Sequence, residues 1–108
     1  MRREEFGEEI ASSEYVFRSP DGSERPVRLR VGRPYVDGGG GWACPVELVG
    51  FERRYPDIVG EDSLQALSLA LTLAWRRLQE FVEKGGLVRD NEGHAYTLDE
   101  LRRILGRD

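Results

Sequence analysis

"GEDSLQALSLALTLAWRRLQEF", residues 60–81, is the stretch that decides the fold, because its pattern is that of one long helix. Asp62 is a favourable N-cap residue, and Gln65 follows it at the three-residue spacing of a capping box. At the other end Gly85, the first of two glycines, suits the left-handed conformation in which many helices stop. The sequence therefore predicts a helix over residues 62–84, about 33 Å long.

Apolar side chains cover more of this helix than one face of a sheet can bury. One stripe consists of Leu64, Leu67, Leu71, Ala74, Leu78 and Phe81. A second stripe, turned away from the first, consists of Ala66, Leu69, Ala70 and Leu73, with Trp75 nearby. We expect one stripe to lie on a sheet, and the other to be covered by the C-terminal segment together with a homodimer contact or a foreign protein. The long helix is therefore the predicted contact for a protein partner or a second copy of the chain.

Before the helix, the period of the sequence changes to two. Residues 14–18 form a short β-type run, and the turn sequence SPDG follows it. Val27, Leu29 and Val31 then alternate with arginine or glycine, which indicates a strand with one buried face. These two runs should pair as a hairpin.

Two more strands are expected between this hairpin and the helix. Residues 42–49, WACPVELV, alternate like a third strand, but Pro45 cannot donate to a ladder and marks an unpaired position or a bulge. A fourth, short strand is expected between residues 52 and 59. The glycines of residues 38–41 should form a mobile hairpin loop, because neither Gly-Lys-Ser/Thr nor a helix follows them to make a phosphate site.

The C-terminal segment should form a short helix that docks on the rest of the molecule. Thr97 and Glu100 have the spacing of a second capping box. An apolar stripe follows, made of Leu98, Leu101, Ile104 and Leu105. A helix this short does not persist alone, so it must pack against something. A small hairpin around residues 91–93 is expected before it.

The order of these elements predicts an α+β fold: an antiparallel four-stranded meander with one long helix packed on one face and a short C-terminal helix. Its length is that of one domain. Within residues 1–108 we expect a loose leader (1–13), an antiparallel sheet (14–59), the long helix (62–84) and a small tail (87–108).

Composition and charge argue against several classes of protein. The net charge of −4 argues against a nucleic-acid binder held by electrostatics. The longest apolar stretch, residues 64–75, is shorter than the ~20 residues that a membrane-spanning helix needs. Cys44 is the only cysteine, which excludes an intrachain disulfide. Because the N-terminus also lacks the apolar region of a signal peptide, we expect a cytoplasmic protein that binds neither nucleic acid nor membrane.

Few residues have the spacing of a catalytic or metal site. Cys44 and His94 are the only residues of their types, so they are the one Cys–His nucleophilic pair that the composition allows. Cys44, however, alternates in phase with Val46 and Leu48, at a core position where cysteine behaves as a small apolar residue. His94 lies in a polar turn, and the acidic residues show no metal-ligand spacing. We therefore expect no catalytic residue, no metal and no cofactor.

The sequence GEDSL at residues 60–64 resembles the attachment site of acyl and peptidyl carrier proteins, G-x-D-S-L, in which the serine carries phosphopantetheine. The resemblance implies that Ser63 would carry the prosthetic arm, with Asp62 beside it and Leu64 facing the modifying enzyme. Carrier proteins are all-helical bundles, whereas β-type runs precede this motif. The alternative is that Asp62 simply caps the helix and Ser63 is an ordinary residue of its first turn.

A second resemblance covers residues 14–82. The sequence WACPVEL, followed by GEDSLQALSLAL, is similar to a family of small uncharacterised bacterial domains with a Trp-x-Cys-Pro strand and a G-x-D-S-x-Q-A-L helix. This resemblance implies the same order of strands and long helix. It implies no activity.

Exposed positions on the predicted strands and helix give a candidate interaction surface. Arginine is suited to bidentate contacts with carboxylates and phosphates, and neighbouring aromatic or leucine side chains can anchor a partner. The candidate residues are Arg28, Arg30, Arg33, Tyr35, Trp42, Leu69 and Leu73. A solvated sheet face is the simpler interpretation of the arginines.

From these observations we expect a non-enzymatic domain that binds protein, with an immunity-type or other inhibitor role as the class that suits a small acidic chain. The alternative function is a phosphopantetheine carrier-like protein modified on Ser63.

Overall fold

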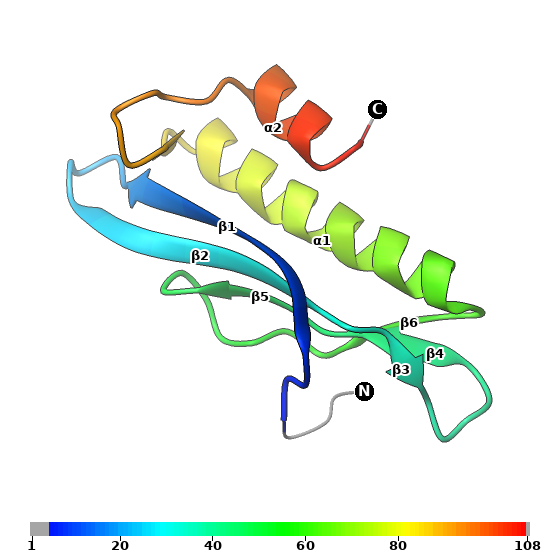
Figure 1. Ribbon diagram of the computed structural model, residues 1–108. Helices are drawn as coiled ribbons and strands as arrows, with labels where there is room; N and C mark the ends of the chain where they lie inside the picture. Colours follow the sequence, from blue (N-terminus) through cyan, green and yellow to red (C-terminus); the bar gives the residue numbers. More distant parts are fainter. Residues whose placement is uncertain (1–4, 108) are drawn as a thin grey trace.

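Two antiparallel sheets lie on one side of a long helix, and a short helix packs beside it (Figure 1). The computed structural model describes residues 5–107. A four-stranded sheet has the order β5-β2-β1-β7, and a three-stranded sheet has the order β3-β4-β6. The strands are β1 (Glu9–Arg18), β2 (Glu24–Gly32), β3 (Tyr35–Val36), β4 (Trp42–Cys44), β5 (Val46–Val49), β6 (Ile58–Gly60) and β7 (Leu87–Arg89). The α+β class with a long helix and a short C-terminal helix is confirmed.

The predicted hairpin is present as β1 and β2, but β1 is longer than expected. It begins at Glu9, so residues 9–13, which we expected in a loose leader, are part of the ladder with β2. A register shift between Glu9 and Ala11 interrupts the period of two, which explains why the alternation was not visible there. Just before it, Phe6 is buried under the guanidinium of Arg30, 3.6 Å from the ring centroid. Residues 1–4 of the expected leader lie outside the described residues.

The expected third strand is divided at Pro45 between the two sheets. β4 pairs with β3 and β6, while β5 pairs with β2. Since proline has no N–H to donate, the ladder breaks there, and the two halves join different neighbours. The strands therefore do not form one simple meander. The fourth strand of the larger sheet is β7, which comes from the tail and pairs with the end of β1.

The fourth strand predicted between residues 52 and 59 is displaced to β6. The preceding residues are held by side chains instead of a ladder. Asp57, almost fully buried, accepts hydrogen bonds from Tyr35 at 2.6 Å and from Arg54 at 2.9 Å. These contacts fix the YPD segment as a connection, and only the residues that follow it, Ile58 to Gly60, pair with β4.

The long helix α1 (Ser63–Glu83) begins and ends where the sequence predicts. The Asp62 side chain accepts a hydrogen bond from the backbone N–H of Gln65 at 2.7 Å, and the Gln65 side chain accepts one from the N–H of Glu61 at 2.6 Å. The return bond thus reaches one residue earlier than in a standard capping box. At the C-terminal end Gly85 has a φ of 98°, the left-handed conformation expected of a helix stop.

The side of α1 that faces the sheets differs from both predicted stripes. Its fully buried residues are Ala66, Ala70, Ala74 and Leu78, which combine members of the two stripes. Leu64, expected to begin the buried seam, is 74% exposed. The alanines let the start of α1 lie very close to β6: a Cβ added at Gly60 would be 2.6 Å from the backbone nitrogen of Ala66. Close packing, more than side-chain volume, decides which stripe is buried.

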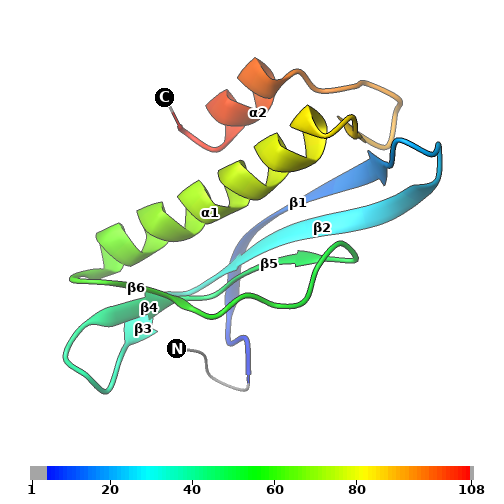
Figure 2. The same ribbon diagram turned by 180° about the vertical axis from the view of Figure 1, so that it is seen from behind.

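The short helix α2 (Leu98–Ile104) packs on α1 of the same chain, as Figures 1 and 2 show from opposite sides. Its predicted capping box between Thr97 and Glu100 is present in full. After it, the Arg107 guanidinium donates to the backbone oxygen of Ser68 at 3.0 Å and to the Thr72 hydroxyl at 2.9 Å. The tail therefore covers the face of α1 that carries Ser68 and Thr72. It does not cover the predicted second stripe, of which Leu69 remains 42% exposed.

Candidate functional site

The arginines of the predicted interaction surface are all engaged by acidic residues of the same chain. Arg28 pairs with Glu9 and lies 3.5 Å from Glu14. Two further pairs join Arg30 to Glu47 at 3.1 Å and Arg33 to Glu8 at 3.3 Å. Each arginine thus has a role in holding neighbouring strands or the N-terminal segment, which favours the solvated-face interpretation.

The remaining residues of that predicted surface do not join the arginines. Tyr35 bonds to buried Asp57, and Trp42 packs against the core. Leu69 and Leu73 belong to α1, which covers the face of the larger sheet opposite to Arg28 and Arg30. The seven candidate residues are therefore spread over two sides of the molecule and form no single surface.

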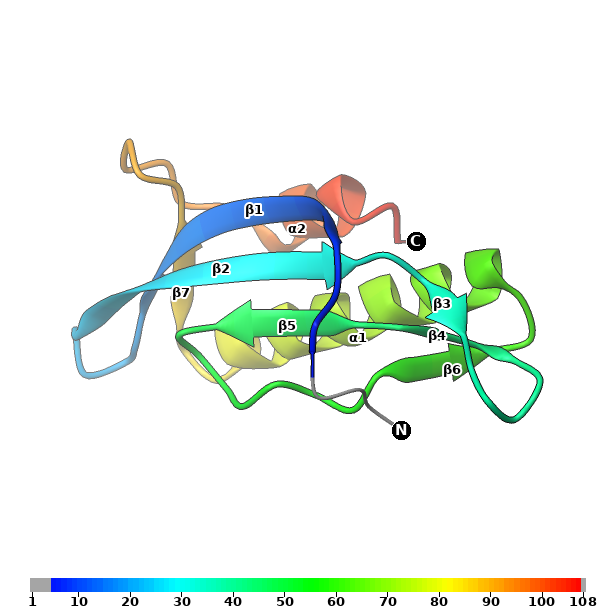
Figure 3. The same cartoon turned by 60° about the horizontal axis from the view of Figure 1, so that its bottom comes forward.

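Cys44 and His94 are too far apart in the fold to act as a pair. Cys44 is buried in β4 under α1, where its thiol donates to the Gly32 carbonyl oxygen at 3.4 Å. Burial, helped by the negative charge of Asp57, raises the pKa of the thiol to about 11. His94 follows β7, which lies at the opposite end of the molecule from β4 (Figure 3), and its ring is 2.9 Å from the Glu100 carboxylate. Cys44 is thus a core residue.

Arg77 stands at the centre of a charge cluster that has a structural role. It donates to both carboxylate oxygens of Glu52, at 2.8 and 2.6 Å, and also pairs with Glu80. The Tyr55 hydroxyl bonds to the same Glu52 carboxylate. Burial opposes ionisation of Glu52, but the bonds from Arg77 and Tyr55 outweigh it and lower the pKa of that carboxyl. The cluster ties the connection before β6 to α1.

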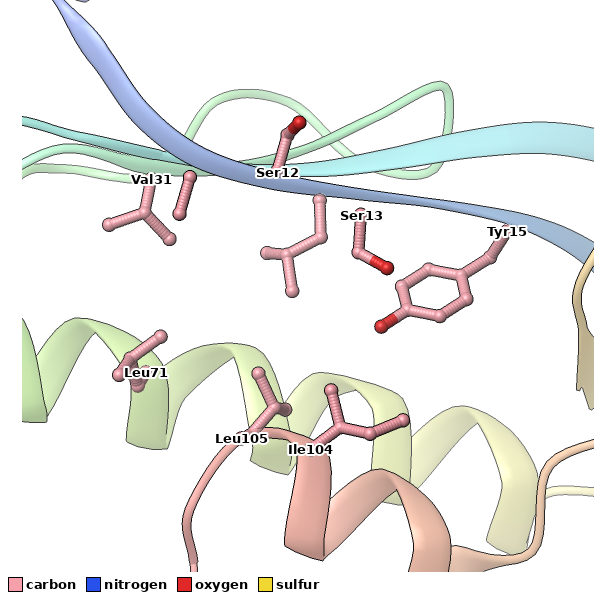
Figure 4. Close-up of a pocket in the computed structure, with 9 residues that line it drawn as sticks. Ser12, Ser13, Tyr15, Val31, Leu71, Ile104 and Leu105 are labelled. Atoms are coloured by element: carbon pink, nitrogen blue, oxygen red, sulfur yellow. The ribbon is translucent and has the colours of Figure 1, made fainter.

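A pocket lies between the larger sheet and the two helices (Figure 4). Its volume is about 180 Å³. It is lined by Ala11, Ser12, Ser13, Tyr15, Leu29, Val31, Leu71, Ile104 and Leu105. Figure 4 shows Ser13 and Tyr15 pointing from β1 toward the helices, whereas Ser12 points away. We call this cavity the β1 pocket.

The strand beside the β1 pocket has one open edge. β1 pairs with β2 along its length, but with β7 only at Val16, Phe17 and Arg18. Among the described residues, nothing pairs with the other side of residues 11–14. Alternate residues of an antiparallel strand direct their N–H and C=O groups to each side, so this edge presents unused backbone donors and acceptors. α2 lies on the β1 side of α1, next to that edge (Figure 3).

Tyr15 supplies the polar group of the β1 pocket. The side chain is 1% exposed, and its hydroxyl makes no hydrogen bond of ordinary geometry within residues 5–107, although the Ser13 hydroxyl lies close enough to act on its pKa. The ring meets Tyr96 edge to face, with centroids 5.7 Å apart. Burial raises the pKa of this phenol above its ordinary value of 10.0 and outweighs the opposite effect of the Ser13 hydroxyl, so the Tyr15 hydroxyl keeps its proton and can donate.

Sequence reasoning missed this pocket because it treated residues 1–13 as a leader. A signal was available: Ala11 and Ser13 continue the alternation of Tyr15 and Phe17 toward the helix side of β1. Two small, weakly apolar residues made that continuation faint. The contribution of α2 to the pocket could not be found without knowing where the tail docks.

The described residues offer little for other classes of site. Within residues 5–107, no group of three or more His, Cys, Asp or Glu side chains is placed to hold a metal ion. In the same part of the chain, no helix combines the length and apolarity that crossing a bilayer requires. Ser63, the residue of the carrier-like motif, is exposed in the first turn of α1.

Comparison with known proteins decides the family. Residues 14–101 match the DUF6968 family, described as a domain of unknown function. The chain belongs to the DUF6968 family. The predicted membership of a family of uncharacterised domains is therefore confirmed. No curated protein and no solved structure is significantly similar to this DUF6968 chain.

The match places part of the β1 pocket inside the DUF6968 domain. Tyr15, Leu29, Val31 and Leu71 fall within the matched residues. Ala11 to Ser13 precede the match, and Ile104 and Leu105 follow it. The pocket is thus lined partly by residues of the matched domain and partly by residues that precede or follow that domain in the sequence.

Proposed function

We propose that this DUF6968 domain is a non-enzymatic protein-binding domain that receives an extended segment of its partner along the open edge of β1. The observation that carries the proposal is the unpaired edge of residues 11–14 beside an apolar pocket. Strand addition uses both: main-chain hydrogen bonds give affinity, and pockets for alternate side chains give specificity.

The sequence predicts a contact with a partner or a second copy on the exposed surface of α1. The structure of that surface supports such a contact less well than the open edge of β1 does. The largest exposed apolar side chains of α1 are Leu64 and Leu69. They are five positions apart, which corresponds to about 140° around a helix, so they do not share a stripe. A homodimer through α1 stays a prediction, and light scattering over a concentration series tests it directly.

Strand addition can be tested with a short peptide of high β-propensity, acetyl-Thr-Val-Tyr-Val-Thr-amide. On titration into the ¹⁵N-labelled chain, we expect saturable shifts of backbone amides in residues 10–14. The same peptide N-methylated on its three central residues has lost its central donors and should cause no such shifts. Shifts confined to Leu64 and Leu69, or none at all, would contradict the proposal.

A matched pair of variants separates the edge from the rest of β1. Ser13 points toward the helices and Ser12 points away from them. Ser13→Lys puts a charge into the pocket next to the edge, which blocks strand addition. We expect Ser13→Lys to abolish the peptide-induced shifts and Ser12→Lys to leave them. Equal effects of the two variants would argue against the pocket side of β1.

The inhibitor or immunity-type role fits this binding mode, since a small acidic domain can occupy a partner by accepting one of its segments. The net charge of −4 favours a partner with a basic surface around that segment.

A carrier-like function is the second candidate, because Ser63 and Leu64 are both exposed at the start of α1. A carrier needs its serine hydroxyl accessible to the modifying enzyme. Incubation with a phosphopantetheinyl transferase and coenzyme A, followed by intact mass, tests it. A mass gain that is lost in Ser63→Ala would favour the carrier; an unchanged mass leaves the protein-binding proposal.

A further inference from the structure

The chemistry of the β1 pocket indicates what kind of side chain it receives. Its walls are mainly aliphatic, from Leu29, Val31, Leu71 and the end of α2. Its volume is about 180 Å³. An apolar cavity of ~150 Å³ in another protein takes up benzene, so one aromatic ring fits a space of this order. The pocket is too small for a long ligand and suits a single large side chain.

The Tyr15 hydroxyl adds a specific requirement. Buried hydroxyls nearly always have a hydrogen-bond partner, and one without a partner calls for an explanation. Here the group is buried in the described structure and points into the space between β1 and the helices (Figure 4). Ser13 brings a second hydroxyl to the same wall. An occupant with a polar tip would give the Tyr15 hydroxyl the partner that it lacks.

A second copy of the chain cannot supply this occupant through its own β1. Antiparallel pairing of two β1 edges would bring Ala11 and Ser13 of each copy to the helix side, and both are too small to fill the pocket. The net charge of −4 on each copy also opposes their association. The open edge and the pocket therefore favour a foreign segment that carries one large residue.

We infer that the β1 pocket receives a tyrosine side chain of the partner segment, with the tyrosine hydroxyl bonded to Tyr15; this inference rests on the proposed strand addition. Phenylalanine would fill the space but leave the Tyr15 hydroxyl without a partner. The two-ring side chain of tryptophan is larger than the single aromatic ring that the volume of the pocket accommodates. A tyrosine hydroxyl both donates and accepts, so it can bond to Tyr15 and to Ser13 together.

Three peptides that differ at one residue test the inference: acetyl-Thr-Val-Xaa-Val-Thr-amide with tyrosine, phenylalanine or alanine at the centre. We expect the tyrosine peptide to bind about tenfold more tightly than the phenylalanine peptide, as loss of one buried hydrogen bond implies. Alanine should bind weakest. On the Tyr15→Phe variant, the preference for tyrosine over phenylalanine should disappear.

Different results separate this inference from the proposed function. If all three peptides shift residues 10–14 with equal affinity, strand addition stands and the tyrosine inference fails. If none of the three binds, both fail. A preference for tyrosine that persists in Tyr15→Phe also overturns the inference.

A fragment titration tests the pocket without the edge. 4-Methylphenol, the tyrosine side chain, should shift the methyl signals of Leu71 and Leu105 more strongly than toluene at equal concentration. Ser13→Leu fills the pocket from β1 and should abolish these shifts, whereas Ser12→Leu, which points away, should retain them. Equal shifts in both variants would place the fragment elsewhere and overturn the inference.

Discussion

Tyr15 is the residue whose replacement gives the clearest stability prediction. Its hydroxyl is buried and makes no hydrogen bond of ordinary geometry in the described structure, even to nearby Ser13, so the folded state loses the hydrogen bonds that water gives it in the unfolded chain. Replacing Tyr15 by Phe removes that cost, and we expect the free energy of unfolding to rise by about 1 kcal/mol. Urea denaturation measures it. A loss of stability of similar size would show that the hydroxyl has a partner in solution.

Cys44 should be unreactive in the folded protein. Raising its thiol pKa from 9.0 to about 11 reduces the thiolate fraction near neutral pH, and burial restricts access as well. We expect iodoacetamide at pH 8 to alkylate native Cys44 at least ~100-fold more slowly than the chain in guanidinium chloride, from the pKa shift alone. Intact mass over time follows the reaction. A rate close to that of the denatured chain would exclude the buried position.

At this scale, the sequence predicts residue roles well only where a local pattern determines them. Cys44 is a core residue as its phase with Val46 indicates, and Asp62 caps the helix as expected. The arginines were a different case. Whether Arg28 or Arg30 meets a partner depends on Glu9 and Glu47, which are distant in sequence, so no local pattern could reveal that they are already paired.

Among the elements, the junction between β6 and α1 depends on one close contact. A side chain at Gly60 would meet the backbone nitrogen of Ala66 at 2.6 Å, and backbone cannot move aside as a flexible side chain does. We expect Gly60→Ala to lower the free energy of unfolding by about 1–3 kcal/mol. Thermal and urea denaturation measure the effect.

Gly38→Ala is the matched control for that junction. A Cβ at Gly38 has no neighbour within 4 Å among the described residues, so its replacement should change stability by less than about 0.5 kcal/mol. If Gly38→Ala cost as much as Gly60→Ala, a general intolerance of alanine for glycine would replace the close-contact explanation.

Docking of α2 should weaken in acid. The backbone N–H of Thr97, together with His94, lowers the pKa of Glu100 below its ordinary value of 4.5. A carboxyl whose pKa is lower in the folded state than in the unfolded state stabilises the fold. This stabilisation is complete when the pH is above the unfolded-state pKa, and it is lost as the pH falls through the folded-state pKa. We therefore expect the capping box to be intact above pH 4.5 and to open progressively below it.

The Thr97 amide signal reports this opening, since its N–H donates to Glu100 at 3.0 Å. Glu100→Gln keeps a hydrogen-bond acceptor without a titrating charge, so its Thr97 signal should stay constant over the same range. The same acid transition in both proteins would assign it to another group, such as Asp90, whose pKa is also lowered by backbone N–H donors, first that of His94.

The elements themselves could be predicted from the sequence because their signals are local. Caps at Asp62 and Thr97 fixed where the helices begin, and the alternation of Val27 to Val31 fixed β2. Strand partners were harder. The change of sheet at Pro45 and the pairing of β7 with β1 depend on contacts between distant segments, which period and propensity do not encode.

For the whole molecule, α1 should make the two sheets unfold together. Its alanines near the start pack by β4 and β6, and its later turns lie over the four-stranded sheet. Trp42 lies in β4, whereas Trp75 lies on α1 near α2. We expect one cooperative transition for both regions.

Single-tryptophan variants check this cooperativity. Trp75→Phe leaves Trp42 to report on the smaller sheet, and Trp42→Phe leaves Trp75 to report on the helices. In each variant, the urea midpoint from fluorescence should coincide with that from far-ultraviolet circular dichroism. A separate transition at Trp42 would mean that the three-stranded sheet opens on its own.

The pairing of β7 with β1 also bears on how the chain folds during synthesis. Phe17 lies opposite Val88, although most of the chain separates them. The ribosome releases β1 and β2 early, but the larger sheet can close only after α1 and β7 have emerged. Until then the whole second edge of β1 is unpaired and can form strand-to-strand contacts with other nascent chains. We therefore expect the time needed to synthesise α1 and β7 to set how long the Val16–Arg18 edge stays open to other nascent chains.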